Sequence, residues 1–212
     1  MSLDRSSHLA FFTDRNWKSV SNFWKDVVSL EEMPSFIQGY DEFQISDLSA
    51  LNSIGQFEFQ SGDPRFKRQT FAVRIGYDGS QYSGYQMQKG IHGILTVEDD
   101  IEASLGRKVV AAGRTDKEVS AVSQIISFAT FDDVSATDIL NKLRDCEAVK
   151  SGRLAIFDCR RVPKRFHALF SATWRRYLYV FPLNSGPFQG VDVDCAFVDR
   201  CLKKYALDNF LH

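Results

Sequence analysis

The sequence lacks the features that mark several classes of protein. Its four cysteines, Cys146, Cys159, Cys195 and Cys201, form no CxxC pair, and its four histidines are scattered, so a metal site is not expected. No apolar run approaches membrane-spanning length. The N-terminal residues carry early acids and no continuous apolar core, unlike a secretory signal. These absences predict an intracellular protein with no membrane span, and they leave cytoplasm, nucleus and organelle open.

The sequence also lacks a charge excess of one sign. The formal net charge of the 212 residues is −1, so the protein as a whole has no global attraction to nucleic acid. One stretch differs. Between Cys159 and Val191 there are six basic residues and no acidic one: Arg160, Arg161, Lys164, Arg165, Arg175 and Arg176. This basic segment is either a solvated face or a surface for phosphate groups.

Three regions are expected along the chain. Residues 1–70 form an extension with one amphipathic helix, because Trp17, Val20, Trp24 and Val27 recur at helical spacing after a cap near Asp14 or Asn16. The helix either docks onto the rest of the protein or binds a partner. Residues 71–182 carry a regular pattern of strands and helices, and residues 183–212 begin an incomplete second half.

The pattern in residues 71–182 predicts an α+β fold. Strands are expected over residues 71–77, 109–112, 123–131, 153–159 and 174–181, and helices over residues 96–105 and 135–144. Thr96 and Asp99 have the spacing of a capping box, and Ile94, Val97, Ile101 and Leu105 would form the buried stripe of the first helix. The order β-α-β-β-α-β is ferredoxin-like, a mainly antiparallel sheet with helices on one face.

The stretch Ala111-Ala112-Gly113-Arg114-Thr115-Asp116-Lys117 holds the most informative polar residues. A short strand runs into Gly113, which permits a sharp backbone course, and three different polar side chains follow. Arg114 can hold a phosphate or stack on a base, and an exposed Asp116 can act as a nucleophile or base. On these residues alone, an ordinary turn with Asp116 hydrogen-bonded to its own backbone is the favoured interpretation.

Three longer motifs favour a functional interpretation. Residues 113–121, GRTDKEVSA, resemble the signature GRTDxGVxA of TruA-type pseudouridine synthases. Residues 77–88, YDGSQYSGYQMQ, resemble the family's YDGxxYxGxQxQ. Residues 166–179 resemble FHAxFSAxxRxYxY, and Thr96-Val97-Glu98 opens the helix between the first two motifs as in the family. The motifs occur in the family's order over slightly more than half of the chain.

The resemblance implies an activity and roles for three catalytic residues. Asp116 matches the aspartate that attacks a target uridine, Arg114 matches the arginine that pairs with it, and Tyr177 matches the tyrosine that stacks on the base. It also implies that uridine in tRNA is isomerised to pseudouridine without a cofactor, and that the protein forms homodimers. Which uridine is modified does not follow from the sequence.

RNA contacts are expected at further positions. Asp78 and Gln86 match residues that line the RNA groove in relatives, although Asp78-Gly79 is also a simple turn sequence. The basic segment, with Arg175 and Arg176 beside Tyr177, is expected to contact phosphates: its members are Arg160, Arg161, Lys164, Arg165, Arg175 and Arg176. By contrast, Tyr179 is expected to be a buried strand residue.

The sequence departs from the family in two places. Glu118 stands where the family motif has glycine, and a positive φ there would strain a glutamate. Residues 197–211 resemble the first helix of the family's second half, but no segment matches the later arginine- and leucine-containing motif. These departures support an alternative hypothesis, a catalytically inactive fragment that binds RNA or forms dimers.

Overall fold

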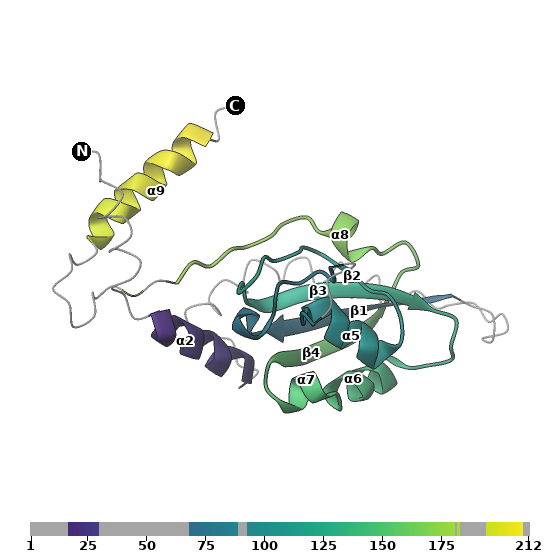
Figure 1. Ribbon diagram of the computed structural model, residues 1–212. Helices are drawn as coiled ribbons and strands as arrows, with labels where there is room; N and C mark the ends of the chain where they lie inside the picture. The colour runs from purple at the N-terminus through teal and green to yellow at the C-terminus, as the bar shows by residue number, and fades with distance from the viewer. Residues whose placement is uncertain (1–16, 30–67, 89–92, 181, 183–193, 210–212) are drawn as a thin grey trace. The chain divides into compact units, whose positions relative to one another are not determined.

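The computed structural model describes residues 17–29, 68–88, 93–180, 182 and 194–209 (Figure 1). The chain divides into two compact units, and the larger, Phe23–Tyr177, contains the described β-sheet. Helix α2 (Trp17–Ser29) confirms the predicted amphipathic helix, while its predicted cap and most of the extension after it lie outside the described residues. Helix α9 (Cys195–Asn209) belongs to the smaller unit and agrees with the helix expected there.

The sheet confirms the predicted α+β class and the ferredoxin-like order. Four strands, β1 (Gln69–Tyr77), β2 (Val110–Ala111), β3 (Ala121–Thr130) and β4 (Leu154–Val162), lie in the order β2-β3-β1-β4. All neighbouring strands are antiparallel. Helix α5 (Val97–Leu105) connects β1 to β2, and α6 (Ala136–Arg144) with the short α7 (Glu147–Lys150) connects β3 to β4.

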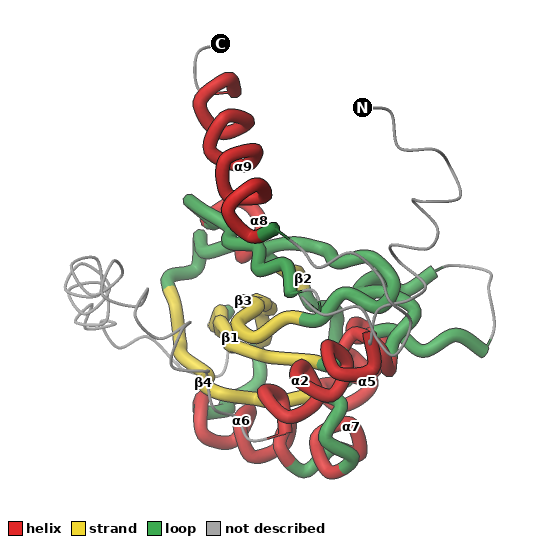
Figure 2. The backbone as a smooth tube through the Cα atoms, turned by 90° about the vertical axis from the view of Figure 1, so that its left-hand side faces the viewer, coloured by secondary structure: helices red, strands yellow, loops and turns green. Residues whose placement is uncertain are grey.

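Both long helices begin where the sequence indicates. The side chains of Thr96 and Ser135 each accept a hydrogen bond from the backbone N–H of the third residue of the helix. The carboxylates of Asp99 and Asp138 in turn accept the backbone N–H of Thr96 and Ser135, which completes two capping boxes. Helices α5, α6 and α7 lie together on one side of the sheet (Figure 2). Their apolar side chains bury that face of the strands, and the resulting core includes Val73, Ile75, Ile101, Ile126 and Leu143.

The other face of the sheet carries the short helix α8 (Ala168–Ser171). The backbone N–H of Ala168 donates a hydrogen bond to Ser127 Oγ, at 2.9 Å. Ser127 neighbours Ile126 on β3, and because successive side chains alternate across a strand, it points away from the helix-covered face. Figure 1 shows α8 on the opposite side of the sheet from α6 and α7.

The predicted strand over residues 174–181 is wrong for the part that the structure describes. Residues 172–180 are assigned to no strand, and Tyr177 and Tyr179 are 83% and 73% exposed. Tyr179 is therefore not the buried residue that was expected. The pattern of apolar residues indicates an extended chain, but a β-strand also needs a neighbouring strand with which it forms backbone hydrogen bonds. Strand β4, in contrast, is longer than predicted and includes Arg160 and Arg161.

None of the helices in the described ranges is both long enough and apolar enough to cross a membrane.

Candidate active site

The loop of residues 113–120, called the aspartate loop here, is held through its backbone. The Gln124 side chain donates a hydrogen bond to the carbonyl of Gly113, at 2.8 Å, and the Tyr85 N–H donates to the carbonyl of Thr115, at 3.0 Å. The hydroxyls of Tyr77 and Thr115 are 2.9 Å apart. Because these bonds use main-chain carbonyls and a threonine, the side chains of Arg114 and Asp116 remain available for a ligand.

Two glycines of the first motif let the chain approach this loop closely. A Cβ on Gly79 would lie 2.3 Å from the carbonyl carbon of Val119, closer than any real contact, and the N–H of Gly79 donates to Ser120 Oγ at 2.9 Å. Gly84 has φ +110°, and a Cβ there would lie 3.4 Å from the carbonyl oxygen of Thr115. The two motifs that are separate in sequence therefore form one packed unit, with residues 77–85 supporting the aspartate loop.

Glu118 adopts the positive φ that is expected where the family motif has glycine. It has φ 67°, and among the described residues it is the one non-glycine residue with a positive φ. The family's glycine would take this conformation without strain, whereas a side chain at φ > 0 costs about 1–2 kcal/mol. The carboxylate points into solvent, where it makes an exposed ion pair with Lys117 at 3.4 Å.

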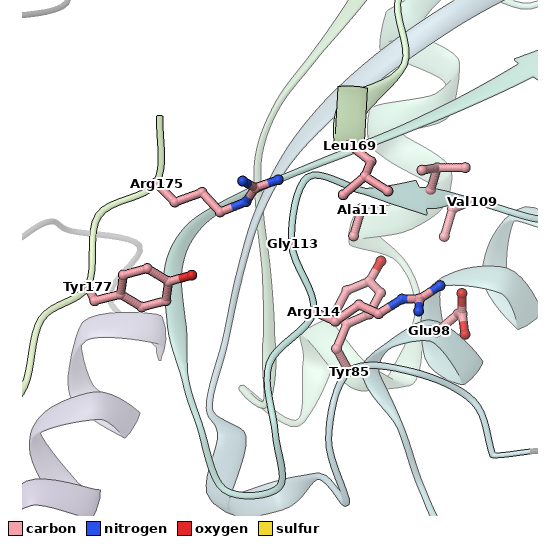
Figure 3. Close-up of a pocket in the computed structure, with 10 residues that line it drawn as sticks. Tyr85, Glu98, Val109, Ala111, Gly113, Arg114, Leu169, Arg175 and Tyr177 are labelled. Carbon is pink, nitrogen blue, oxygen red and sulfur yellow. The ribbon is translucent and has the colours of Figure 1, made fainter. Parts of the chain in front are cut away.

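A pocket of about 420 Å³ opens beside the start of the aspartate loop (Figure 3). It lies at the β2 edge of the sheet, between the loop, the start of α5 and the segment that carries Arg175 and Tyr177. The described residues that line it are Tyr85, Glu98, Val109, Val110, Ala111, Gly113, Arg114, Leu169, Arg175 and Tyr177. Aromatic rings, apolar walls and two guanidinium groups suit a planar ligand that carries negative charge.

Within the pocket, the side chain of Arg114 runs past the ring of Tyr85 and is directed toward Glu98 (Figure 3). Glu98 is held in place, because its carboxylate accepts the N–H of Met87 at 2.8 Å. Tyr85 is almost fully buried, and burial, reinforced by the charge of Glu98 and opposed by that of Arg114, raises its pKa. The pocket lining therefore includes a neutral phenol beside a carboxylate and a guanidinium group.

Asp116 is exposed and does not line this pocket. Its carbonyl accepts the N–H of Val119 at 3.2 Å, which closes a turn. In the described part of the chain, no ion pair joins Arg114 to Asp116. The pairing that the resemblance implies stays a prediction, and Asp116 lies two residues from the pocket-lining Arg114 on the same loop.

The two positions predicted to line an RNA groove differ in structure. Asp78 is buried, and its carboxylate accepts hydrogen bonds from the Ser80 N–H, at 3.1 Å, and hydroxyl, at 2.8 Å. It caps the short 3-10 helix η3 (Gly79–Gln81), so the structure agrees with the turn interpretation of Asp78. Gln86 is exposed beside the pocket residue Tyr85, and a groove contact there stays a prediction.

The basic segment is divided by the fold into two places. Arg160 and Arg161 are exposed on β4, at the edge of the sheet opposite to β2, and Arg160 forms an ion pair with Asp158. Lys164 and Arg165 are exposed in the turn that follows β4. Arg175 and Arg176 lie instead on the segment that reaches the aspartate loop. The six basic residues therefore do not form one continuous stripe along a single element.

Sequence reasoning missed several residues that build the site. Tyr85 and Glu98 line the pocket, and Gln124 anchors the loop, but none was assigned a role there. Tyr85 and Glu98 fall inside motifs that were identified, so the signal was present in the sequence. Gln124 lies in an ordinary strand pattern, which gives no sign that its side chain turns back to the Gly113 carbonyl.

Comparison with known proteins connects this site to one group of relatives. The chain is 39% identical over 114 residues to the tRNA pseudouridine synthase A of Chlorobium luteolum. It is 34% identical over 125 residues to that of Malacoplasma penetrans, and 33% identical over 127 residues to that of Neisseria gonorrhoeae. No family model matches the chain.

These similarities cover part of each protein. They extend over 50%, 56% and 57% of this chain, and over 43%, 49% and 45% of the respective relatives. The chain therefore spans somewhat less than half the length of the curated relatives it matches. The four-stranded antiparallel sheet and its helices agree with one half of the pseudouridine synthase fold.

Proposed function

Because this chain belongs over about half of its length to the TruA-type family of tRNA pseudouridine synthases, we propose that it acts in the isomerisation of uridine to pseudouridine in tRNA. The observation that best supports the proposal is the pocket at the aspartate loop, where Arg114 and Tyr177 line one cavity. A cavity of about 420 Å³ is large enough for a single nucleotide taken out of its stack.

The proposed chemistry assigns one task to each of three side chains. Asp116 is the nucleophile that attacks the target uridine while the bond between ribose C1′ and uracil N1 breaks. The uracil turns, C1′ joins C5 as its bond to the Asp116 carboxylate breaks, the proton of C5 is lost, and N1 gains a proton. The product is an isomer of the substrate, so the overall change involves no net oxidation or reduction.

Arg114 and Tyr177 are proposed to hold the extruded nucleotide. Taking a base out of the stacked RNA costs a few kcal/mol, and stacking on an exposed aromatic ring offsets about 1–3 kcal/mol of this per base. Tyr177 is 83% exposed, so its ring is accessible for such stacking. Arg114 supplies a planar cation that can hold a phosphate in two hydrogen bonds or lie on a base.

The test is tritium release from tRNA that carries 5-tritiated uridine, since the C5–H bond breaks during the reaction. The chain is compared with its Asp116→Asn variant, which keeps the shape of the side chain and removes its negative charge. We expect release by the chain and none by the variant, with both proteins folded by circular dichroism. Undiminished release by the variant would show that Asp116 is not the nucleophile.

A second candidate function is favoured by one observation. Glu118 holds a positive φ in the aspartate loop. In this alternative, the chain binds RNA or forms a homodimer without completing a reaction. It predicts salt-dependent tRNA binding with no tritium release, and a dimer mass by light scattering.

A further inference from the structure

Arg175 is bonded to the aspartate loop rather than extended into solvent. Its Nε and Nη2 atoms both donate hydrogen bonds to the carbonyl oxygen of Ala112, at 3.0 and 2.6 Å. A Cβ on Gly113 would lie 3.4 Å from the same Nε, so the guanidinium packs directly against the start of the loop. Figure 3 shows the side chain of Arg175 directed from its own segment toward the loop at Gly113.

This contact joins two parts of the site that are far apart in sequence. Arg175 and Ala112 are separated by 63 residues, and Tyr177 lies only two residues beyond Arg175. Residues 172–177 are extended but belong to no strand, so no β-ladder holds them in register with the loop. The two hydrogen bonds of Arg175 supply a connection where strand pairing is absent from the described residues.

The geometry also limits what Arg175 can offer to a phosphate. A guanidinium binds an anion best through two parallel N–H groups, and here Nε and Nη2 already share one carbonyl oxygen. Ala112 in turn is fixed to the sheet, since its N–H donates to the carbonyl of Ile125 at 2.8 Å. Arg175 therefore holds a rigid point of the site through its Nε–Nη2 edge, which leaves only its Nη1–Nη2 edge for a phosphate.

We propose that Arg175 is a positioning residue that fixes Tyr177 relative to Arg114 and Asp116, a role distinct from phosphate binding. The inference rests on the proposed function, because the position of Tyr177 matters for turnover only if a uridine is modified. Misplacing a stacking group by about 1 Å is expected to lower the rate by about 10-fold to 100-fold while binding of the whole tRNA changes little.

The first test compares Arg175→Met with Arg176→Met, two adjacent substitutions that each remove one positive charge. We expect R175M to lower kcat by at least about 10-fold with a KM close to that of the wild type. R176M is expected to act mainly on KM, through lost attraction to the RNA backbone. The inference is overturned if both variants raise KM alike and leave kcat unchanged, because Arg175 is then an ordinary phosphate contact.

A second test needs no catalytic activity. Chymotrypsin cleavage after Tyr177 reports how firmly this segment is held, and mass spectrometry measures its rate. We expect R175M to be cleaved several-fold faster than R176M while their unfolding midpoints agree. Equal cleavage rates would show that the two hydrogen bonds from Arg175 to Ala112, called the clamp here, do not hold the segment. If the wild-type chain releases no tritium but R175M is cleaved faster, the proposed function fails and the clamp between Arg175 and Ala112 stands.

A double-mutant cycle tests whether Arg175 affects kcat by positioning Tyr177 or by a separate route. If Arg175 acts through Tyr177, then R175M in a Tyr177→Ala background should lower kcat by less than about 2-fold. Losses in kcat that multiply across the two substitutions would show that Arg175 acts on the reaction by a separate route, against the inference.

Discussion

Tyr82 and Tyr85 allow a sharp test of the packing beneath the candidate site. Both belong to the motif over residues 77–88, both are buried, and burial is the main cause that raises the pKa of each. Their hydroxyls differ. The Tyr82 hydroxyl donates to Asp100 Oδ2 at 2.8 Å, whereas the Tyr85 hydroxyl is buried with no hydrogen-bond partner among the described residues. Removing the same oxygen atom from each should therefore have opposite effects.

The magnitudes follow from the partners. Asp100 also accepts two hydrogen bonds from Arg153, at 2.9 and 3.1 Å, so Tyr82→Phe leaves the carboxylate paired and removes one bond to a charged group. We expect a loss of about 2 kcal/mol in the free energy of unfolding. Tyr85→Phe removes a buried polar atom that forms no bond, and this should increase the free energy of unfolding by about 1 kcal/mol.

Urea unfolding at pH 7, followed by circular dichroism, measures both effects. With unchanged m-values, the transition midpoint should move down for Y82F and up for Y85F relative to the wild type. The reasoning is refuted if Y85F lowers the stability by about as much as Y82F. That result would mean that the Tyr85 hydroxyl has a partner in solution, and that the region around Glu98 and Arg114 is arranged differently.

Three further predictions concern the aspartate loop and the same tyrosines. Glu118→Gly should relieve the strain of φ 67° and stabilise the protein by up to about 1 kcal/mol, whereas Glu118→Ala, which removes the charge and keeps the strain, should not. Gly79→Ala should destabilise by more than about 3 kcal/mol in thermal unfolding, because its Cβ would meet the Val119 backbone at 2.3 Å. Gly113→Ala should be tolerated, because its Cβ would lie 3.4 Å from Arg175 Nε, an ordinary contact distance. The pKa values of Tyr82 and Tyr85 are raised in the folded state, so the unfolded chain ionises these groups first as pH rises above about 10. The free energy of unfolding should therefore be unaffected by their ionisation below about pH 10 and fall above it. Y85F should reduce this fall in urea titrations at alkaline pH.

Much of the fold was predictable because its signals are local. The N-termini of α5 and α6 were predicted correctly, since the bonds of Thr96 with Asp99 and of Ser135 with Asp138 lie within one helical turn. Strands β1 and β3 were also predicted, because their alternating apolar residues face a core covered by helices. The strain at Glu118 was anticipated from the glycine that the family motif has there, and the observed φ of 67° agrees.

The failures occurred where the outcome depends on a distant partner. The alternation over residues 174–181 resembles a strand, but the structure gives the described part of it no ladder. The carboxylate of Asp78 caps its own turn, as the sequence allowed, and its contact with RNA stays a prediction. The basic segment appeared uniform in sequence, but Arg160 lies at one edge of the sheet and Arg175 is bonded to Ala112 at the other.

The sequence by itself therefore determined the helices, most strands, the order of the motifs and the family that half of the chain resembles. These properties depend on the spacing of residues within a few turns or on motifs matched one by one. The tertiary structure decided which residues share a pocket, that Gly79 and Gly84 support the aspartate loop, and that Arg175 points back to Ala112. Such contacts join residues 30 or more positions apart, and their geometry is set by the packing of the sheet, which no local pattern encodes.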